Sequence, residues 1–470
     1  MNIWYAASEA TPYYKTGGLA DVAGSLPRCW ARLGHQVTVV LPLYRGLNQA
    51  YQTRLELLTE LAFELGGVSY SSRVLASPSG QAQLRVLLID MPWAFDRDSL
   101  YGQPDFPDNV VRFAVWGRSL AGLLLSHGVV NVLVGNDWQC GPLLAYARRY
   151  CPAVKRVLCI HNLAYQGRTS LTVLPWIELA GHAEFGHYEF YGSFNSLKLG
   201  LCEAQLLLTV SPSYAREIQT PEYGSGLEGV LAARAGRLHG ILNGLDAKLW
   251  NPNLPNIPVP YSRKTGVKKK ENLATLRRAT QMPSVPGPVF GFVGRLDRQK
   301  GVDLLAAAFV RWFQNHSGQL WVLGSGDNGL AAELRRLQHR FPDRVYLGLH
   351  FNAQQAEHLY AVCDFLLLPS RYEPCGLGQL IAYRFGTIPI ARRTGGLADT
   401  IVDLNEGQPD RPGTGLLFND YSVDALCAAL DRALALYADS RLLKKLQRQV
   451  MSLEFSWEQS AQAYLRLFES

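Results

Sequence analysis

The first half of this 470-residue chain alternates short apolar runs with longer stretches in which apolar residues recur at helical spacing. The short runs predict buried strands, and the longer stretches predict amphipathic helices. Strands that alternate with helices indicate a parallel sheet covered by helices on both faces. The predicted strands are 2–7, 37–41, 84–89, 132–136, 157–160 and 205–210, and the helices include 19–33, 110–126 and one from Cys140.

The same alternation starts again after residues 251–260, which are rich in Pro and Asn. That composition is typical of a linker, so we place a domain boundary at 250/251. A second doubly wound domain is expected, which makes the chain an α/β protein. Its predicted strands are 289–293, 320–323, 345–347, 365–368 and 388–391, with helices from 302, 330, 354 and 376 and final helical segments at 424–437, 441–451 and 457–468.

The composition allows two or three domains and favours a small anionic ligand. Hydrophobic residues make up 48% of the chain, and the net charge of +7 is modest and mostly dispersed, which disfavours a nucleic-acid surface. Eight cysteines show no C-x-x-C pair and no metal-ligand spacing with histidine, which indicates a reducing cytosol. With no basic-then-apolar leader and no apolar stretch of about 18 residues, we expect a cytoplasmic protein without a membrane segment.

Residues 370–400 carry the strongest chemical signal. Glu373 lies in the polar turn between the predicted strand 365–368 and the helix that starts at Gly376. In open α/β sheets ligands bind outside the carboxyl ends of the strands, and free N–H groups at a helix start attract anions. The turn therefore predicts a phosphate or sugar site. The alternative is a loop carboxylate beside an ordinary helix-start glycine.

The segment Lys15-Thr-Gly-Gly-Leu-Ala-Asp21 is repeated almost letter for letter as Arg393-Thr-Gly-Gly-Leu-Ala-Asp399. Each copy combines a cation, a glycine pair and a helix start, which is the composition of a backbone cradle for an oxyanion. Two such turns in two halves of the chain predict two nucleotide-fold domains that face a shared cleft.

Polar motifs follow two other predicted strands of the first half. Asp137 follows one strand, and the pair His161-Asn162 follows the next. Because the carboxyl ends of parallel strands meet at one edge, both motifs are expected on the same side of the sheet as Lys15. A histidine at a strand end is as often structural as catalytic, and both roles stay open at this point.

Arg295 and Lys300 follow the first predicted strand of the second half, in the run G-R-L-D-R-Q-K-G. A departing diphosphate needs positive charge beside it, and here Arg295 offers a planar guanidinium and Lys300 a point charge ahead of a helix. The alternative is that both residues are ordinary surface cations. Residues 324–329, G-S-G-D-N-G, match a dinucleotide fingerprint in a poor context. They follow the second strand of their domain, and His350 stands where an acid for a ribose is expected.

Seven motifs occur in order between Lys15 and Thr400: K-T-G-G-L-A-D-V, N-D-W-Q, H-N-L-A-Y-Q-G, N-G-L-D, G-R-L-D-R-Q-K-G, R-Y-E-P-C-G-L and R-R-T-G-G-L-A-D-T. In this order, and with close to full-length coverage, the chain resembles the bacterial glycogen synthase and starch synthase family. The resemblance implies a GT-B fold, with Rossmann-like domains at 1–250 and 251–452 facing a deep cleft and a helix at 453–470 crossing back to the first. It also implies a retaining glucosyltransferase that elongates an α-1,4-glucan or maltooligosaccharide from ADP-glucose, without a metal or other cofactor.

The resemblance assigns roles residue by residue. Lys15, Arg295 and Lys300 would hold the donor diphosphate, Glu373 and His161 would lie beside the glucose, and Phe351 would lie against the adenine. The implied catalytic residues are Asp137, His161, Arg295, Lys300 and Glu373; the donor side adds Lys15, Gly18, Phe351, Cys375, Gly376 and Leu377, and the sugar and acceptor side adds Asp21, Asn162 and Asn243.

Two positions depart from related patterns. Gly378 stands where the family usually has Thr, which removes a hydroxyl that could touch phosphate or sugar. Ile381 stands where related retaining transferases outside this family carry a second Glu, so the site has one such carboxylate.

Three other functions stay open. A GT-B transferase for a small acceptor or lipid is disfavoured by two long aromatic loops, 91–109 and 165–191, which suit stacking on sugar rings as well as core packing. A catalytically silent glucan-binding protein is disfavoured because the implied phosphate and sugar residues are all present. A nucleotide-dependent oxidoreductase is disfavoured by its poorly placed glycine motif.

Overall fold

A computed structural model describes the whole chain except residues 48, 53, 103, 104, 180–182, 351 and 470. It divides into an N-terminal unit, Met1–Leu242 with Trp457–Ser470, and a C-terminal unit, Asn243–Ser456. The division at 242/243 precedes the expected boundary at 250/251. Leu245 explains this difference, because its side chain is buried in the core of the C-terminal unit and its N–H donates to the Phe455 carbonyl at 2.8 Å.

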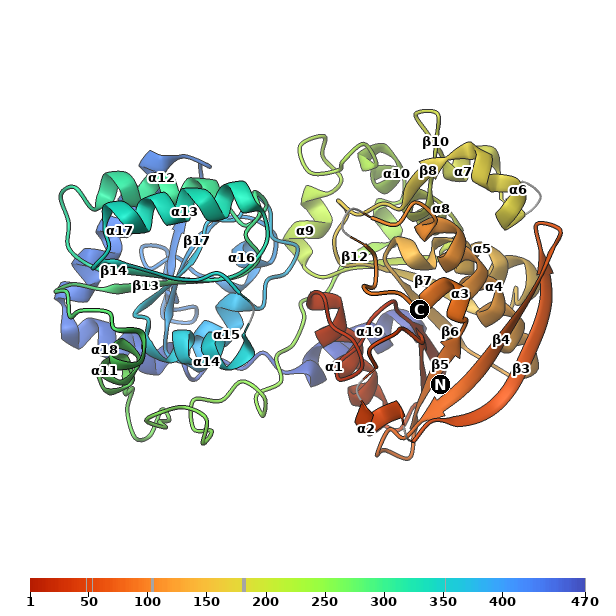
Figure 1. The fold of residues 1–470 in the computed structure, drawn as a ribbon, viewed down its shortest axis with the longest axis horizontal. Coiled ribbons are helices and arrows are strands. Elements are labelled where there is room, and N and C mark those ends of the chain that lie inside the picture. The colour runs from red at the N-terminus through yellow and green to blue at the C-terminus, as the bar shows by residue number, and fades with distance from the viewer. Residues whose placement is uncertain (48, 53, 103–104, 180–182, 351, 470) are drawn as a thin grey trace. The chain divides into compact units, whose positions relative to one another are not determined.

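The N-terminal unit is built on a nine-stranded sheet (Figure 1). Seven strands are parallel, and β1, the middle strand of the nine, pairs with β2 on one side and β6 on the other. The parallel strands are β1 (Asn2–Ala6), β2 (Gln36–Pro42), β5 (Leu84–Asp90), β6 (Val132–Asn136), β7 (Lys155–Ile160), β11 (Leu206–Thr209) and β12 (Leu238–Gly240). The six strands predicted for this half are confirmed.

An antiparallel hairpin, β3 (Glu56–Leu65) and β4 (Val68–Ser77), extends this sheet beyond β5 and was not predicted. Its strands join at Gly66-Gly67, both with positive φ. A glycine pair between two alternating runs is a hairpin signal, so the sequence did contain the information. A separate three-stranded sheet contains β8 (Arg168–Ser170), β10 (Ser193–Asn195) and β9 (Glu189–Phe190).

Helices cover the N-terminal sheet, and the last helix of the chain belongs to this unit. The helix α19 (Trp457–Glu469) packs on α1 (Gly18–Arg32), where the Trp30 indole donates to the Ala461 carbonyl at 3.2 Å and stacks edge-on against Tyr464. The other helices are α2 (Gln49–Gln52), α3 (Pro92–Phe95), α4 (Asn109–Ser126), α5 (Gly141–Tyr150), α6 (Leu174–Ile177), α7 (Phe185–Tyr188), α8 (Ser196–Glu203), α9 (Pro212–Glu217) and α10 (Glu228–Ala233).

The C-terminal unit holds a six-stranded sheet that is parallel throughout. Its order is β15 (Val345–Gly348), β14 (Gln319–Leu323), β13 (Val289–Val293), β16 (Phe365–Leu368), β17 (Ile388–Arg392) and β18 (Leu416–Phe418). The chain moves outward from β13 in one direction and then continues from β16 in the other. The gap between β13 and β16 is therefore a topological switch point, where open α/β sheets bind ligands.

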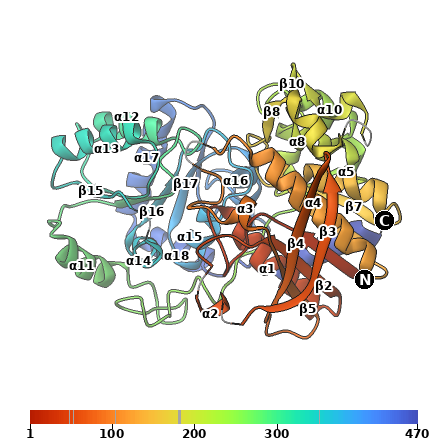
Figure 2. The same cartoon turned by 45° about the vertical axis from the view of Figure 1, so that its right-hand side comes forward.

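Helices lie on both faces of this second sheet (Figures 1 and 2). One face carries α12 (Val302–Trp312), α13 (Asn328–Arg340) and α17 (Val423–Ala438), and the other carries α11 (Lys269–Thr280), α14 (Ala353–Val362), α15 (Gly378–Arg384) and α18 (Ser440–Val450). The five predicted strands are confirmed, and β18 was missed because it is only three residues long.

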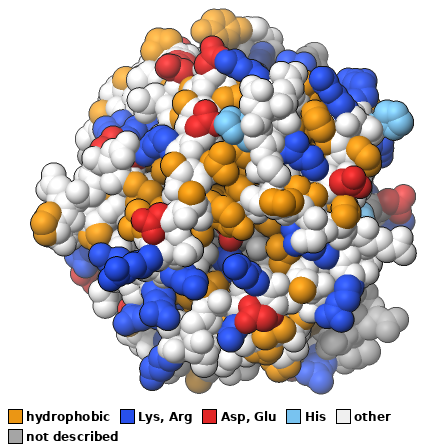
Figure 3. Space-filling model, turned by 90° about the vertical axis from the view of Figure 1, so that its left-hand side faces the viewer, with side chains coloured by type: hydrophobic (Ala, Val, Ile, Leu, Met, Phe, Trp, Pro, Cys, Tyr) orange, Lys and Arg blue, Asp and Glu red, His pale blue; other side chains and the backbone are white. Residues whose placement is uncertain are grey.

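Charged side chains of both signs lie on the face that Figure 3 shows. On the face shown in Figure 3, Lys and Arg side chains are scattered among acidic and apolar ones and form no single stripe. Among the described helices, none is both long enough and apolar enough to cross a membrane.

Candidate functional site

Lys300 and Glu373 meet at the switch point of the C-terminal sheet. Lys300 follows β13 and Glu373 follows the neighbouring strand β16. The Lys300 ammonium donates to both carboxylate oxygens of Glu373, at 2.8 and 2.7 Å, and the Ser370 hydroxyl donates to Oε2 at 2.9 Å. The Glu373 side chain is only 6% exposed, whereas the Lys300 side chain is 25% exposed. The strand-end position predicted for Glu373 therefore brings it to a fixed cation.

The two loops that carry this pair are packed against each other. Gly301 has φ +73°, and a Cβ there would lie 2.0 Å from the Pro369 carbonyl oxygen, so only glycine allows the approach. The Arg371 N–H donates to the Gln299 carbonyl at 2.8 Å. The Lys300 backbone N–H donates to the Asp297 carboxylate at 2.8 Å, which fixes the start of the loop before α12.

Gln379 holds the turn that follows Glu373, and sequence reasoning missed it. Its buried amide Nε2 donates to the carbonyls of Cys375 and Gly376, at 3.1 and 3.0 Å, and to the Thr400 hydroxyl at 3.1 Å. Gly376 has φ +74°, and a Cβ there would lie 2.6 Å from Gln379 Oε1. One side chain thus ties the Glu373 turn to the end of α16 (Gly395–Thr400).

Arg295 lies on the same loop as Lys300 and is half-exposed. Its guanidinium contacts the Gln299 side-chain oxygen at 3.2 Å and the Asp297 carboxylate at 3.3 Å. Gly324 of the G-S-G-D-N-G motif lies under this loop, since a Cβ there would be 2.0 Å from the Gly294 carbonyl. The glycine motif therefore supports the Arg295 loop, which agrees with the poor context noted for a dinucleotide site.

The second Gly-Gly turn has a different use from the one predicted. The Gly396 N–H donates to the Glu373 carbonyl at 3.0 Å, and a Cβ at Gly396 would lie 2.1 Å from the Cys375 carbonyl. Arg393 pairs with Glu406 at 2.5 Å and contacts the Asn419 side chain at 3.2 Å. The prediction that this turn is an oxyanion cradle is wrong for Gly396, because its N–H is already used to support the Glu373 turn.

Other donor-side positions surround this turn. Leu377 is the residue before α15, and burial raises the pKa of the adjacent Cys375 thiol to about 12, so the thiol stays protonated. The backbone N–H of Asn243 hydrogen-bonds to Cys375, and the Asn243 side chain is 7% exposed. Its buried Oδ1 has no partner among the described residues. Phe351, expected against the adenine, lies outside the described residues.

The structure shows what surrounds the two positions that depart from related patterns. A Cβ at Gly378 would face the Leu368 side chain at 3.2 Å, with the Tyr360 hydroxyl and Leu366 at 3.6 Å. A side chain here would therefore begin beside Leu368 and the Tyr360 hydroxyl, and the loss of a ligand-facing hydroxyl at Gly378 stays a prediction. Ile381 is 5% exposed and belongs to the core of the C-terminal unit.

In the N-terminal unit, Lys15 and Asp21 form an ion pair at the start of α1. Their N–O distances are 2.7 and 2.8 Å, and their side chains are 42% and 28% exposed. Gly18 is the first residue of α1, and a Cβ there would meet no atom within 4 Å. This first Gly-Gly turn therefore leaves open space beside its helix start, as a ligand cradle requires.

Glu9 holds the first Gly-Gly turn through hydrogen bonds to Thr16, and sequence reasoning did not predict this role. Its buried carboxylate accepts hydrogen bonds from the Thr16 backbone N–H and, at 2.8 Å, from the Thr16 hydroxyl. Burial raises the pKa of Glu9, against the opposing effect of these hydrogen bonds. Glu9 lies shortly after β1, which ends at Ala6, so its place near a strand end was a signal similar to that of Asp137.

Asp137 organises the loop that carries His161. The strands β6 and β7 are neighbours, and Asp137 Oδ1 accepts from the His161 backbone N–H at 2.7 Å and more weakly from that of Asn162 at 3.5 Å. Asp137 has φ +54°, a strained conformation for a non-glycine residue. Burial raises the pKa of its carboxyl to about 7 despite these hydrogen bonds. The Asp137 carboxylate therefore holds the backbone of the loop that begins at His161.

The hydrogen bonds of Asn136 define the state of the His161 ring. Asn136 Nδ2 donates to the Ala6 carbonyl at 2.8 Å, so its Oδ1 is the acceptor for the Tyr5 hydroxyl at 2.9 Å and for His161 Nε2 at 2.8 Å. This network assigns the proton to Nε2 and leaves a lone pair on Nδ1. Burial lowers the pKa of His161 to about 3, so the ring is neutral at pH 7.

The predicted residues thus gather at two sheet edges, one in each unit. In the C-terminal unit the structure brings together Lys300, Glu373, Cys375, Gly376 and Leu377, with Arg295 on the same loop as Lys300. In the N-terminal unit it brings Asp137 to His161 and Asn162, and Lys15 to Asp21. Across the residues that the structure describes, no group of three His, Cys, Asp or Glu side chains is placed to hold a metal ion.

Two family models match the chain. Residues 2–233 match the starch synthase catalytic domain, and residues 278–450 match the glycosyl transferases of group 1. Among solved structures, the catalytic domain of starch synthase IV from Arabidopsis thaliana, which has ADP and acarbose bound, is 31% identical with a TM-score of 0.90, covering 100% of this chain and 98% of that one. Sucrose-phosphate synthase from Thermosynechococcus elongatus, at 19% identity and a TM-score of 0.61, supports the fold alone.

Curated relatives match over nearly their whole length. The glycogen synthase of Syntrophotalea carbinolica is 41% identical over 100% of this chain and 98% of its own, and that of Myxococcus xanthus is 42% identical over 100% and 99%. The predicted fold class of two Rossmann-like domains, as in GT-B glycosyltransferases, is confirmed. The chain belongs to the glycogen synthase and starch synthase family of glycosyltransferases.

Proposed function

We propose that this enzyme transfers glucose from ADP-glucose to the non-reducing end of an α-1,4-glucan with retention of configuration, and that it needs no metal ion. The observation that carries the proposal is the Lys300–Glu373 pair at the switch point of the C-terminal sheet. It puts a fixed cation and a buried carboxylate side by side, where a diphosphate leaves and a sugar carbon becomes positive.

The cations would act on the leaving group. As the bond between glucose and diphosphate breaks, negative charge grows on the phosphate oxygens, and Lys300, Arg295 and Lys15 supply the compensating positive charge. Lys300 is held by Glu373 and by its own backbone bond to Asp297, so little reorganisation is needed when that charge appears. Arg295 adds a planar fork that suits a phosphate.

Glu373 would act on the sugar. Its carboxylate is fixed by Lys300 and Ser370 and stays next to the cation that binds the phosphate. From this place it stabilises positive charge at the reacting carbon or orients the glucose hydroxyls. Family membership and the supporting bonds from Gln379 and Gly396 favour this role over that of an ordinary loop carboxylate.

His161 would recognise a sugar hydroxyl as a neutral group. Because Nε2 donates to Asn136, the Nδ1 lone pair is available as an acceptor. Asp137 holds the backbone beneath this ring, so it acts through His161 and Asn162 as a positioning residue. We infer no separate protein nucleophile, and we favour a route in which the leaving phosphate takes the proton of the acceptor hydroxyl on the same face.

The cysteines support a cytoplasmic location for this activity. All eight are free thiols, and seven of them are buried. Buried reduced thiols behave as small apolar side chains and suit a reducing compartment.

A transfer assay tests the proposal. Purified protein is incubated with radiolabelled ADP-glucose or UDP-glucose, each with glycogen, with maltooligosaccharides or with no acceptor, and the polymer-bound label is counted. We expect incorporation from ADP-glucose into both acceptors, in the presence of EDTA as well. Label confined to short products with every acceptor would instead support a small-acceptor transferase, and no transfer from either donor would overturn the proposal.

A further inference from the structure

A cavity of about 340 Å³ lies in the N-terminal unit where three neighbouring strands begin, β7, β11 and β12. We call it the strand-start cavity, and its lining residues are Lys155, Gln205, Leu206, Gly236, Arg237 and His239. The volume lies within the range of small-molecule sites, about 300 to 1,000 Å³. His161 follows the other end of β7, so at about 3.3 Å per residue it lies about 20 Å from this cavity. The cavity is therefore separate from the candidate site.

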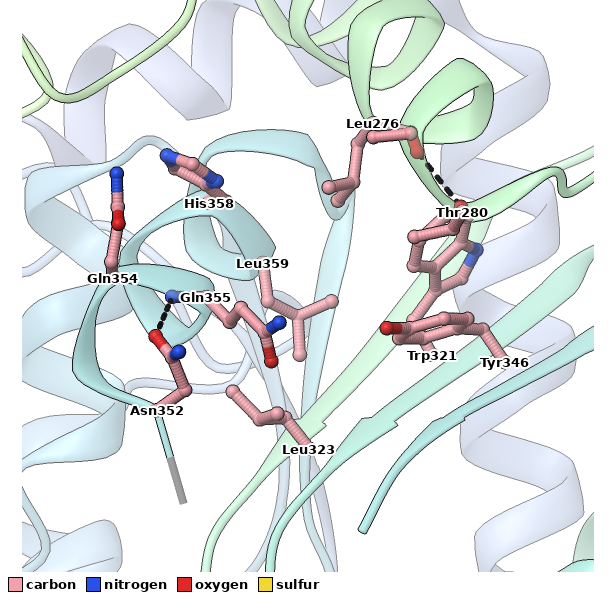
Figure 4. Close-up of a pocket in the computed structure, with 11 residues that line it drawn as sticks. Leu276, Thr280, Trp321, Leu323, Tyr346, Asn352, Gln354, Gln355, His358 and Leu359 are labelled. Atoms are coloured by element: carbon pink, nitrogen blue, oxygen red, sulfur yellow. Dashed lines mark hydrogen bonds between the residues drawn. The ribbon is translucent and has the colours of Figure 1, made fainter. Parts of the chain in front are cut away.

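The charge of its lining distinguishes the strand-start cavity from one of about 390 Å³ in the C-terminal unit. The latter lies between α11 and α14, where Figure 4 shows amide, hydroxyl and apolar side chains around the space. None of the described residues that line it is Lys, Arg, Asp or Glu. The strand-start cavity is lined instead by two cations and a histidine, with no acid among its described residues. Such a lining concentrates positive potential and selects an anion.

The lining offers hydrogen-bond donors that the folded chain does not use. The Lys155 ammonium donates to the carbonyls of Leu467 and Phe468 in the last turn of α19, both at 3.0 Å, and keeps a third N–H. The side chains of Arg237 and His239 have no hydrogen-bond or ion-pair partner among the described residues. Phosphate oxygens accept hydrogen bonds from such groups, and an arginine fork suits them in particular.

Gln205 adds a further donor beside these cations. Its Oε1 accepts from the Arg156 backbone N–H at 2.9 Å, which leaves the Nε2 amide group without a partner in the described part of the chain. This amide group can donate to a phosphate oxygen or to the hydroxyl of a phosphate ester. Leu206 is buried next to it and gives the cavity an apolar wall.

The positive charge is not neutralised by the surrounding chain. Among the described residues, no acid pairs with Lys155 or Arg237. Glu203, at the end of α8, already pairs with Arg148 at 3.0 Å and with a histidine at 2.8 Å. Arg234 donates to backbone carbonyls at the same helix end, and burial together with the nearby Arg237 lowers its pKa. A helix end carries only about half a negative charge, so an excess of positive charge remains.

We propose that the strand-start cavity binds a phosphate group, as the free ion or as a small ester, separately from the donor diphosphate. The anion lies between Arg237, which precedes the edge strand β12, and Lys155, which begins β7. Because Lys155 also holds the last turn of α19, the ligand joins all three elements and stabilises the folded N-terminal unit. The proposal goes beyond the proposed function, since its ligand is neither the donor nor the glucan.

The experiment is a calorimetric titration of the full-length protein with saturating ADP, which occupies the proposed donor site. The probes are glycerol 3-phosphate, inorganic phosphate and glycerol, at constant ionic strength. Arg237→Gln removes a charge from the cavity, and Arg54→Gln removes one from an exposed position of the same unit outside it. Gln205→Glu keeps an acceptor for the Arg156 N–H and adds a negative charge. Thermal melts without ligand check that each variant is folded.

We expect glycerol 3-phosphate to bind wild type and Arg54→Gln equally, and Arg237→Gln and Gln205→Glu about tenfold more weakly, near the low end for one hydrogen bond to a charged group. Glycerol should not bind. Inorganic phosphate that binds as tightly as the ester identifies the free ion as the ligand, and weaker binding identifies an ester; both support a phosphate site.

Two results would overturn the proposal. Loss of phosphate binding when ADP is present would assign the anion to the donor site, and equal affinities of Arg237→Gln and Arg54→Gln would show that the cavity does not hold it. The titration measures no turnover, so its outcome is independent of the transfer assay.

Discussion

The two Gly-Gly turns share almost the same letters and are used in different ways. Gly18 in the first turn and Gly396 in the second are equivalent positions of the repeat. A methyl group at Gly18 would meet open space, whereas one at Gly396 would lie 2.1 Å from the Cys375 carbonyl. The first turn is open at its helix start, and the second is packed beneath the turn that carries Glu373.

The supports of the two turns also differ in kind. A buried carboxylate, Glu9, holds the first turn through Thr16, whereas the second turn and the Glu373 turn are joined by a backbone hydrogen bond and by Gln379. The first turn therefore has the features of a binding surface and the second those of a scaffold. A repeated motif predicts a repeated backbone shape, and only the surrounding packing decides whether a ligand can reach it.

The largest expected effect is at Lys300, the cation that pairs with the Glu373 carboxylate. Lys300→Ala removes a fixed cation from the proposed leaving group, and loss of one such preorganised contact costs about 3 to 4 kcal/mol, or a 10²- to 10³-fold loss of turnover. Lys444→Ala, at an exposed position on α18, is the control. Turnover near that of wild type for Lys300→Ala, at saturating ADP-glucose, would contradict the phosphate assignment.

Gly396→Ala tests the scaffold role directly. The new methyl group cannot fit beside the Cys375 carbonyl, so the Glu373 turn must move. Overpacking of this kind costs about 1 to 3 kcal/mol, and a displacement of about 1 Å can reduce turnover about 10²-fold. We expect a lower melting temperature of the C-terminal unit together with the loss of turnover. A normal melting temperature with normal turnover would show that the turn tolerates the shift.

These residues show how far sequence reasoning reaches. The predicted strands were correct because apolar runs bounded by turns are local signals, and parallel pairing then brings strand ends such as those before Lys300 and Glu373 to one edge. Whether Gly396 packs under Cys375 depends on a contact between segments about 20 positions apart, which no local pattern reports. The same holds for Gln379, whose three bonds join two motifs, and for the neutral state of His161, which depends on Asn136 and on burial.

The stability of the folded protein should depend on pH through Asp137, whose carboxyl holds the loop that carries His161. Its pKa of about 7 in the fold compares with about 3.9 in an unfolded chain, so the folded protein keeps a proton that the unfolded chain loses in this range. The stabilisation is therefore complete below about pH 4 and is lost as the pH rises through 7. Asp137→Asn keeps an oxygen acceptor for the His161 N–H and removes the titration.

We accordingly expect the melting temperature of Asp137→Asn, relative to wild type, to rise between pH 5 and pH 8. The underlying slope is at most about 1.4 kcal/mol per pH unit, and solvent screening reduces it. Asp410→Asn, at an exposed position, should show no such trend. A difference between Asp137→Asn and wild type that stays constant over this range would mean that the folded carboxyl titrates normally.

The smallest effect on stability is expected at Gly18, the open counterpart of Gly396. Because a Cβ at Gly18 meets no atom within 4 Å and alanine favours helices, Gly18→Ala should keep the melting temperature or raise the stability by up to about 1 kcal/mol. If the open space holds the donor diphosphate, the same methyl group should raise the KM for ADP-glucose about tenfold, the low end of what one such group does in a binding site.

Gly122→Ala is the matched control, because it makes the same change inside α4, away from the proposed ligand. A Cβ at Gly122 would have only the Arg118 side chain near it, at 3.6 Å, so this variant should show the effect on helix stability alone. A raised KM with unchanged stability would identify the first turn as the binding surface, and a KM equal to that of Gly122→Ala would contradict donor binding at Gly18.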